Sequence, residues 1–129
     1  MNQGYTQMQY PFKTKRYCQT MELKDDAELI RKYCLAHDEQ HFRPEIMAGM
    51  REVGILEMEV YIAGNRLVMI VEAHEDFNWD DAMARLATLP GQQEWEEYVA
   101  QFQNCSAEAT SDEKWQMMTR IFHIYDKGE

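Results

Sequence analysis

Two apolar segments joined by a very short turn constrain the fold of this chain more than any other feature. Residues 55–62 and 67–73 have the composition of β-strands, and only residues 63–66, which include a Gly-Asn pair, separate them. A connection this short joins antiparallel neighbours in a hairpin. The second segment is apolar on both faces apart from Glu72, which is typical of a strand covered on both sides. The sequence therefore predicts a sheet with this second strand in its interior.

The segments on either side of the hairpin predict further strands and helices. Residues 16–23 alternate in polarity, as a first strand does. A helix with a 3.6-residue period follows, with Asp25 as its N-cap and Glu28 completing a capping box. Pro44 suits the first turn of a second helix, which Gly54 ends. Beyond the hairpin we expect helices at 79–89 (capped by Asn78) and 92–102, a loop at 104–113 and a last strand at 119–125.

This order of elements is β-α-β-β-α-β, the split βαβ pattern of ferredoxin-like α+β folds. Right-handed crossovers place the helices on one face of a four-stranded antiparallel sheet. A second copy of the chain could cover the opposite face, so we expect a homodimer that forms a dimeric α+β barrel. The alternative is a monomer with a partly hydrated sheet face. We expect residues 15–127 to form this single domain after a flexible N-terminal tail of residues 1–14.

The charge balance argues against several classes of partner. The 129 residues include 13 Lys and Arg and 23 Asp and Glu, a formal net charge of −10. Such a surface repels nucleic acid and anionic lipid but leaves neutral ligands unaffected. No segment has the length and apolar composition of a membrane span, and the N-terminus lacks the pattern of a secretory signal. Three widely spaced cysteines match no zinc or disulfide pattern, so we expect a cytoplasmic protein with reduced thiols.

Tyr33 and His37 are the residues best suited to acid–base chemistry. They lie four residues apart in a predicted helix, which places both rings on one face. An imidazole with a pKa of ~6.5 can accept or donate a proton at neutral pH, and a neighbouring phenol can hydrogen-bond a hydroxyl group. The alternatives are a histidine that stabilises the helix end and a tyrosine that packs beneath the helix. Phosphate-loop and serine-nucleophile motifs are absent from the sequence, so phosphoryl transfer and serine hydrolysis lack support.

Three further groups of residues have both a functional and a structural interpretation. His37 and His41 have a spacing that binds a metal when one helix carries both residues, but Pro44 predicts a break nearby. Trp95 could provide a platform for the apolar face of a sugar ring, or it could pack on the sheet. The mixed faces of the strands could line a polar cavity, or they could form a hydrated dimer seam or an edge. Their residues are Glu22, Glu57, Glu59, Tyr61, Glu72 and His123.

At these residues the chain resembles the L-rhamnose mutarotase family. The segments that carry the resemblance are, in order, Tyr33-x3-His37, Pro44-Glu45-Ile46, Ile70-Val71-Glu72, Trp95-Glu96-Glu97-Tyr98 and Arg120-Ile121-Phe122. Members of this family are small ferredoxin-like dimers that interconvert the α and β anomers of a deoxyhexose without a metal or cofactor. The resemblance therefore implies a carbohydrate isomerase whose partner is a monosaccharide.

The resemblance also implies roles for individual residues. His37 corresponds to the acid/base of the family, and Tyr33 and Trp95 correspond to residues that contact the sugar. Met58 and Glu96 stand where the family has a sugar-binding tyrosine and the second of two adjacent tryptophans. These departures surround the sugar, and the chain looks like the branch associated with L-fucose, which is a 6-deoxy-L-sugar like L-rhamnose.

Two other functions fit the same fold. The first is a non-catalytic sugar-binding or regulatory dimer, which would keep Trp95 and the polar cavity but would not need His37. The second is an enzyme of different chemistry, such as a cofactorless monooxygenase or a lactone isomerase, because one fold supports many functions. Such enzymes usually have an apolar cavity for an aromatic substrate, and strand faces rich in glutamate argue against one.

Overall fold

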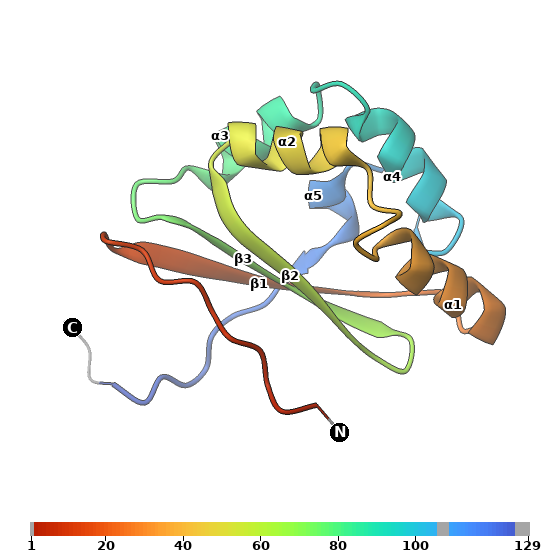
Figure 1. The fold of residues 1–129 in the computed structure, drawn as a ribbon, viewed down its shortest axis with the longest axis horizontal. Coiled ribbons are helices and arrows are strands. Elements are labelled where there is room, and N and C mark those ends of the chain that lie inside the picture. Colours follow the sequence, from red (N-terminus) through yellow and green to blue (C-terminus); the bar gives the residue numbers. More distant parts are fainter. Residues whose placement is uncertain (1, 106–108, 126–129) are drawn as a thin grey trace.

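A single four-stranded sheet with helices over one face makes up the fold (Figure 1). The computed structural model describes residues 2–105 and 109–125. The strands are β1 (Thr14–Glu22), β2 (Ile55–Ala63), β3 (Arg66–His74) and β4 (Gln116–Met117), and the helices are α1 (Ala27–Ala36), α2 (Pro44–Glu52), α3 (Trp79–Leu86), α4 (Gln92–Ala100) and α5 (Ser111–Lys114). All strand pairs are antiparallel and their order is β2-β3-β1-β4, which confirms the predicted ferredoxin-like α+β class. In the described ranges no helix has the length and apolar character to cross a membrane.

The predicted β2–β3 hairpin forms, and β3 lies in the interior of the sheet. It pairs with β2 along one side and with β1 along the other. Gly64 and Asn65 make the connection, and Gly64 has a φ of 61°. In the described ranges only glycines have a positive φ, so the φ of Asn65 is negative. A positive φ at the first central residue alone is the pattern of a type II′ turn, which matches the twist of paired strands.

Replacing Gly64 with alanine is expected to lower the free energy of unfolding by about 1–2 kcal/mol, because a Cβ atom disfavours left-handed backbone. A Cβ built at Gly64 meets no described atom within 4 Å, so the cost comes from the backbone alone. Gly49→Ala in α2 is the control, since a Cβ there meets leucine side chains at 3.5 Å or more. Urea unfolding of both variants checks the prediction, and an unchanged stability of Gly64→Ala would contradict it.

The helices begin where local signals place them, with one displacement. Asp26, rather than the predicted Asp25, caps α1, because the Asp26 side chain is the one that accepts a hydrogen bond from a backbone N–H of the first turn. Pro44 is the first residue of α2, as predicted, since its fixed φ suits that position. Asn78 caps α3, also as predicted. Short polar side chains therefore cap α1 and α3, whereas α2 begins at a proline and has no side-chain cap.

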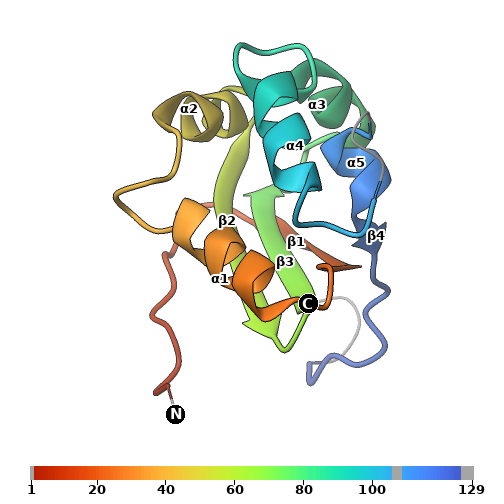
Figure 2. The same cartoon turned by 90° about the vertical axis from the view of Figure 1, so that its right-hand side faces the viewer.

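The core lies between the sheet and the helical layer. Alternate residues of β3 face the helices and are buried, namely Leu67, Met69, Val71 and Ala73. The helical residues of the same cluster include Ile46 of α2, Leu86 of α3, and Trp95 and Val99 of α4. Seen from the α1 end, α4 lies between α2 and α5 (Figure 2). The intervening residues of β3 are only half-buried, so the other face of the sheet is the more open one.

The prediction of a strand at residues 119–125 is wrong. The strand that completes the sheet is β4, which contains only residues 116–117 and pairs with two residues of β1. Residues 119–125 form no helix or strand, and the side chain of Ile121 is 95% exposed. Alternating apolar residues favour a strand, but a strand also requires a neighbour to pair with. The chain diverges from β1 after Met118, so this segment has the pattern of a strand without the partner.

The segment predicted as a loop at residues 104–113 contains the start of α5. Thr110 and Glu113 form a capping box, in which each side chain accepts a hydrogen bond from the other's backbone N–H. The sequence signature of this box is present, but small polar residues around it favoured a loop. Residues 106–108 of the predicted loop lie outside the described residues.

The polar residues of the strands gather on the sheet face opposite the helices and not around His37. Five of the residues lie on the sheet face that points away from the helices, namely Glu22, Glu57, Glu59, Tyr61 and Glu72, and His123 lies in the segment after β4. On this face Tyr61 donates a hydrogen bond to Glu59 at 3.0 Å, and Gln7 of the N-terminal segment donates another to the same carboxylate. Of the six, Glu57 also borders the cavity described next, where a register shift interrupts β2 between Ile55 and Glu57. The alternation along the strands therefore grouped these residues on one face, and that face is the one opposite the helices.

Candidate active site

A cavity of about 560 Å³ lies between the sheet and the helical layer. Its apolar floor includes Met58 and Val60 of β2 and Met69 and Val71 of β3. The polar side chains around it include His37, Arg51, Gln92, Glu96 and Gln103. Ligand sites in proteins usually measure roughly 300–1,000 Å³ and combine apolar walls with a few polar groups. The cavity therefore suits a small ligand that carries both hydroxyl groups and an apolar face.

His37 lines this cavity as the first residue after α1. Its backbone leaves the helical conformation, with φ −103° and ψ 0°, so the ring stands at the helix end. The ring nitrogen Nδ1 lies 2.8 Å from the carbonyl oxygen of Tyr33. A carbonyl oxygen only accepts hydrogen bonds, so Nδ1 carries the proton and donates a hydrogen bond to this oxygen. The neutral ring then has an unprotonated Nε2, which can act as a base.

Aromatic rings surround His37 and change its proton affinity. The ring centroids of Tyr33, Trp95 and Phe42 lie 4.3, 5.2 and 5.5 Å from that of the imidazole. Burial in these surroundings lowers the pKa of His37 below its ordinary value, because the charged form is poorly solvated. The Tyr33 carbonyl raises this pKa, but its effect is the smaller one. The imidazole is therefore neutral at pH 7.

We expect nuclear magnetic resonance to detect His37 as a neutral ring at pH 7 with its proton on Nδ1. A long-range ¹H–¹⁵N correlation spectrum distinguishes the two neutral tautomers from each other and from the charged ring. The His37 signal is assigned by its loss in His37→Ala, and His41→Ala serves as the control that retains it. A ring protonated on Nε2, or a pKa above ~6.5, would contradict the geometry.

Tyr33 supports His37 from inside the protein. Its side chain is 3% exposed, and it lies behind the imidazole rather than among the described residues that line the cavity. Burial raises the pKa of the Tyr33 phenol, and contact with the Gln103 side chain only partly opposes this. The phenol therefore stays protonated at any pH at which the protein functions. The direct sugar contact expected for Tyr33 stays a prediction.

Trp95 of α4 forms a wall of the cavity next to His37. The two rings meet edge to face, with an interplanar angle of 65°. Phe42 packs against both rings and lies 5.1 Å from the indole centroid. The guanidinium of Arg43 lies 5.4 Å from the Trp95 ring, within cation–π range. These contacts hold the indole in place, as a stacking platform requires.

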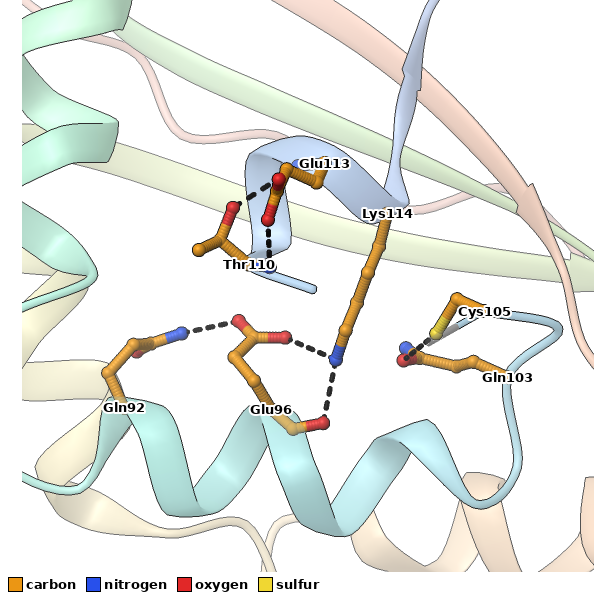
Figure 3. Close-up of polar contacts among 7 residues, drawn as sticks. All are labelled: Gln92, Glu96, Gln103, Cys105, Thr110, Glu113 and Lys114. Atoms are coloured by element: carbon orange, nitrogen blue, oxygen red, sulfur yellow. Dashed lines mark hydrogen bonds and ion pairs between the residues drawn. The ribbon is translucent and has the colours of Figure 1, made fainter. Parts of the chain in front are cut away.

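Two residues that replace sugar contacts of the family pattern lie at the cavity. Met58 contributes to the floor from β2, and Glu96 lines the wall from α4. The Glu96 carboxylate forms an ion pair with Lys114 and accepts a hydrogen bond from Gln92 (Figure 3). Sequence analysis missed both partners of Glu96. The four-residue spacing of Gln92 and Glu96 was the available signal, because it places the two side chains on one helix face.

The spacing of His37 and His41 does not bring the two rings onto one helix face. Helix α1 ends at Ala36, so both histidines lie beyond it. His41 instead contacts Asp38, with 2.6 Å between Nδ1 and a carboxylate oxygen, and this contact lowers the pKa of Asp38. Among residues 2–105 and 109–125 no three His, Cys, Asp or Glu side chains gather as metal ligands would.

Known proteins resemble this chain in sequence and in structure. The sequence model of the L-rhamnose mutarotase family matches residues 16–124. An L-fucose mutarotase of Xanthomonas campestris pv. campestris is 36% identical over 110 residues, which cover 85% of this chain and 88% of the relative. A UPF0734 protein of Dictyostelium discoideum is 26% identical over 113 residues, covering 87% of this chain and 89% of that protein. The crystal structure of an L-rhamnose mutarotase from Formosa agariphila matches with a TM-score of 0.64 at 17% identity, covering 86% of this chain and 99% of that chain, and supports the fold alone.

Fold and site together define a small ferredoxin-like protein with a cavity beside a neutral histidine. The match over residues 16–124 and the 36% identity show that the chain belongs to the L-rhamnose mutarotase family. Its members are isomerases that act on carbohydrates, which confirms the class that the sequence resemblance implied.

Proposed function

We propose that the protein interconverts the α and β anomers of a 6-deoxy-L-hexose and that His37 is its acid/base. The observation that carries this proposal is the unprotonated Nε2 of a half-buried imidazole at the wall of the cavity. Trp95 stands beside the ring and lines the same cavity, where its indole could contact the apolar side of a sugar. Tyr33 contributes by holding the imidazole through its carbonyl oxygen and its ring.

Anomer exchange requires proton movements and the reversible cleavage of one C–O bond. Nε2 of His37 accepts the proton of the anomeric hydroxyl, the bond between C1 and the ring oxygen breaks, and the ring oxygen takes a proton from water. The open sugar has an aldehyde at C1, which turns about the C1–C2 bond. The reverse steps return the proton from His37 and close the ring as the other anomer. A positioned acid/base contributes ~10²–10⁴-fold to such a rate.

We propose L-fucose as the substrate. The 36% identity to an L-fucose mutarotase over most of both chains supports this choice. The presence of Met58 and Glu96 at the cavity also supports it, since they are the residues that depart from the rhamnose pattern.

Saturation-transfer nuclear magnetic resonance tests the reaction and the substrate together. Catalytic amounts of protein are added to L-fucose and to L-rhamnose separately, and the exchange rate between the two anomers is measured. We expect faster exchange for L-fucose. Catalysis with L-rhamnose alone would correct the substrate, whereas binding of either sugar without faster exchange would favour the non-catalytic sugar-binding protein.

We further propose that two copies of the chain associate through the sheet face opposite the helices. Half-buried apolar residues of β3 on that face, such as Val68 and Ile70, support this assembly. Large exposed apolar side chains follow β4, namely Ile121, Phe122, Ile124 and Tyr125. Light scattering coupled to size-exclusion chromatography should show a dimer for the full chain and a smaller dimer fraction after truncation at Met118. A monomeric full chain would contradict the proposal.

We also propose that the protein acts in the cytoplasm. Cys18, Cys34 and Cys105 are all unpaired thiols, which supports a reducing compartment. Fractionation of cells that produce the protein checks this, and recovery outside the cytoplasmic fraction would contradict it.

A further inference from the structure

A charged pair is buried between α4 and the short helix α5 (Figure 3). The Lys114 side chain is fully inaccessible, and its Nζ donates to a Glu96 carboxylate oxygen at 2.8 Å and to the Glu96 backbone carbonyl at 2.6 Å. The second carboxylate oxygen of Glu96 accepts a hydrogen bond of 2.6 Å from the Gln92 amide. Both oxygens are thereby held in fixed positions from two directions. The proposed proton transfers at His37 make no use of this pair.

This carboxylate lies at the cavity that contains His37 and Trp95. Glu96 follows Trp95 in α4, and Gln92 lines the same cavity one turn earlier. A second cavity of about 280 Å³ also has Gln92 and Glu96 in its wall, so the pair lies between two hollow regions. The Glu96 side chain retains 11% exposure although its ammonium partner has none. The accessible part of the pair therefore belongs to the carboxylate.

Hydrogen-bond capacity indicates what this carboxylate can do. An ionised carboxylate has about four acceptor positions and no donor. Lys114 and Gln92 occupy one position on each oxygen, so each oxygen can accept a further hydrogen bond. A sugar hydroxyl is a donor of the required kind, and bonds from neutral donors to charged acceptors are among the stronger ones.

We propose that Glu96 determines sugar specificity by accepting a hydrogen bond from a hydroxyl group other than the anomeric one. Lys114 and Gln92 are positioning residues that fix the direction of the carboxylate. This inference rests on the proposed mutarotase function, because it concerns the same cavity and the same ligand. A carboxylate fixed in one direction binds a hydroxyl group in one configuration more tightly than in the other. When that hydroxyl is absent or inverted, the carboxylate loses this hydrogen bond.

The test compares wild-type protein with Glu96→Gln on L-fucose, L-rhamnose and L-fucose analogues that each lack one non-anomeric hydroxyl. Exchange rates are measured by saturation transfer, and binding is measured separately by calorimetry. Glu97→Gln is the matched control, since Glu97 is the next residue on α4, is exposed and lies outside the cavity of His37. Gln92→Met is a second variant, which removes one positioning contact without leaving a buried charge unpaired.

We expect wild-type protein to lose about tenfold or more in kcat/KM on one deoxy analogue, which identifies the contacted hydroxyl. The kcat/KM of Glu96→Gln on L-fucose should be lower than that of the wild type by a similar factor. Loss of the contacted hydroxyl should not lower it further, so the two proteins should have similar kcat/KM values on that analogue. Gln92→Met should reduce the ratio of the kcat/KM values for L-fucose and L-rhamnose, and Glu97→Gln should leave this ratio unchanged. A purely structural role would lower the rates for all sugars by one common factor.

The outcomes separate this inference from the proposed function. Exchange by the wild-type protein with no strong dependence on any one hydroxyl, or with the same dependence in Glu96→Gln, would overturn the role of Glu96 and leave the mutarotase intact. Sugar binding without exchange would remove the proposed reaction, and calorimetry on the same analogues would still decide the contact. If the protein neither catalyses exchange nor binds a sugar, both the proposed function and the role of Glu96 are overturned. If Glu96→Gln fails to fold, the wild-type analogue series and Gln92→Met decide the question alone.

Discussion

His37→Ala is expected to reduce the rate of anomer exchange by ~10²–10⁴-fold, the usual contribution of a positioned acid/base. The variant removes the Nε2 atom that accepts the anomeric proton, while the surrounding aromatic rings remain. The fold should persist, because the imidazole lies at a helix end and not in the centre of the core. Saturation transfer on the preferred sugar measures the rate. Full activity of His37→Ala would remove the imidazole from the mechanism.

Two controls separate chemistry from structure at His37. His41→Ala should keep wild-type activity, because that ring is largely exposed and contacts Asp38 rather than the cavity. The pH profile gives the second control. The pKa of His37 is lowered, so the ring stays unprotonated at neutral pH and becomes charged only when the pH falls through a value below ~6.5. The value of kcat/KM should therefore fall on the acid side, and an acid limb centred above ~6.5 would contradict the assignment.

Lys114→Met is expected to lower the free energy of unfolding by about 3–5 kcal/mol, which is the usual cost of removing one partner from a buried ion pair. The Glu96 carboxylate would lose its ammonium partner, and the Glu96 backbone carbonyl would lose a donor. Urea denaturation of the variant measures the change. Lys32→Met is the control and should change stability little, because Lys32 is exposed on α1.

The double variant Lys114→Met/Glu96→Gln identifies the cause of that loss. Removing both charges removes the uncompensated carboxylate, so the double variant should be more stable than Lys114→Met alone. If it is equally unstable or worse, the cost comes from lost packing of the lysine stem and not from the charge. These unfolding measurements use other variants than the measurement of sugar selectivity, which uses Gln92→Met, so the two effects are determined independently.

The hairpin and the helix starts were predictable from sequence because each depends on residues close together in the chain. Gly64 makes its turn through its own backbone, and Pro44 begins its helix through its own ring. The segment at 119–125 shows the opposite case. Its alternating apolar side chains satisfy the local requirement for a strand, but pairing depends on a neighbour that the sequence pattern does not specify.

The candidate site was predictable to the extent that it lies within one helix turn. Tyr33 and His37 are four residues apart, so their contact follows from helix geometry, and the structure places their rings 4.3 Å apart. The partner of Glu96 is different. Lys114 lies 18 residues further along the chain and reaches Glu96 only because α5 packs beside α4. The alternation of the strands grouped Glu59 with Glu72, but it did not specify that this face lies opposite His37, because the position of the helices over the sheet decides that.

The position of the cavity has a consequence for the lifetime of the protein. It occupies space between sheet and helices that a solid core would fill, and its floor of methionine and valine side chains lacks packing partners there. A ligand that binds only the folded state stabilises it by about 2.7 kcal/mol at one hundred times its dissociation constant. The proposed sugar ligand would therefore be a reversible part of the interior. We expect the protein to resist proteolysis longer when the sugar is present than when it is absent.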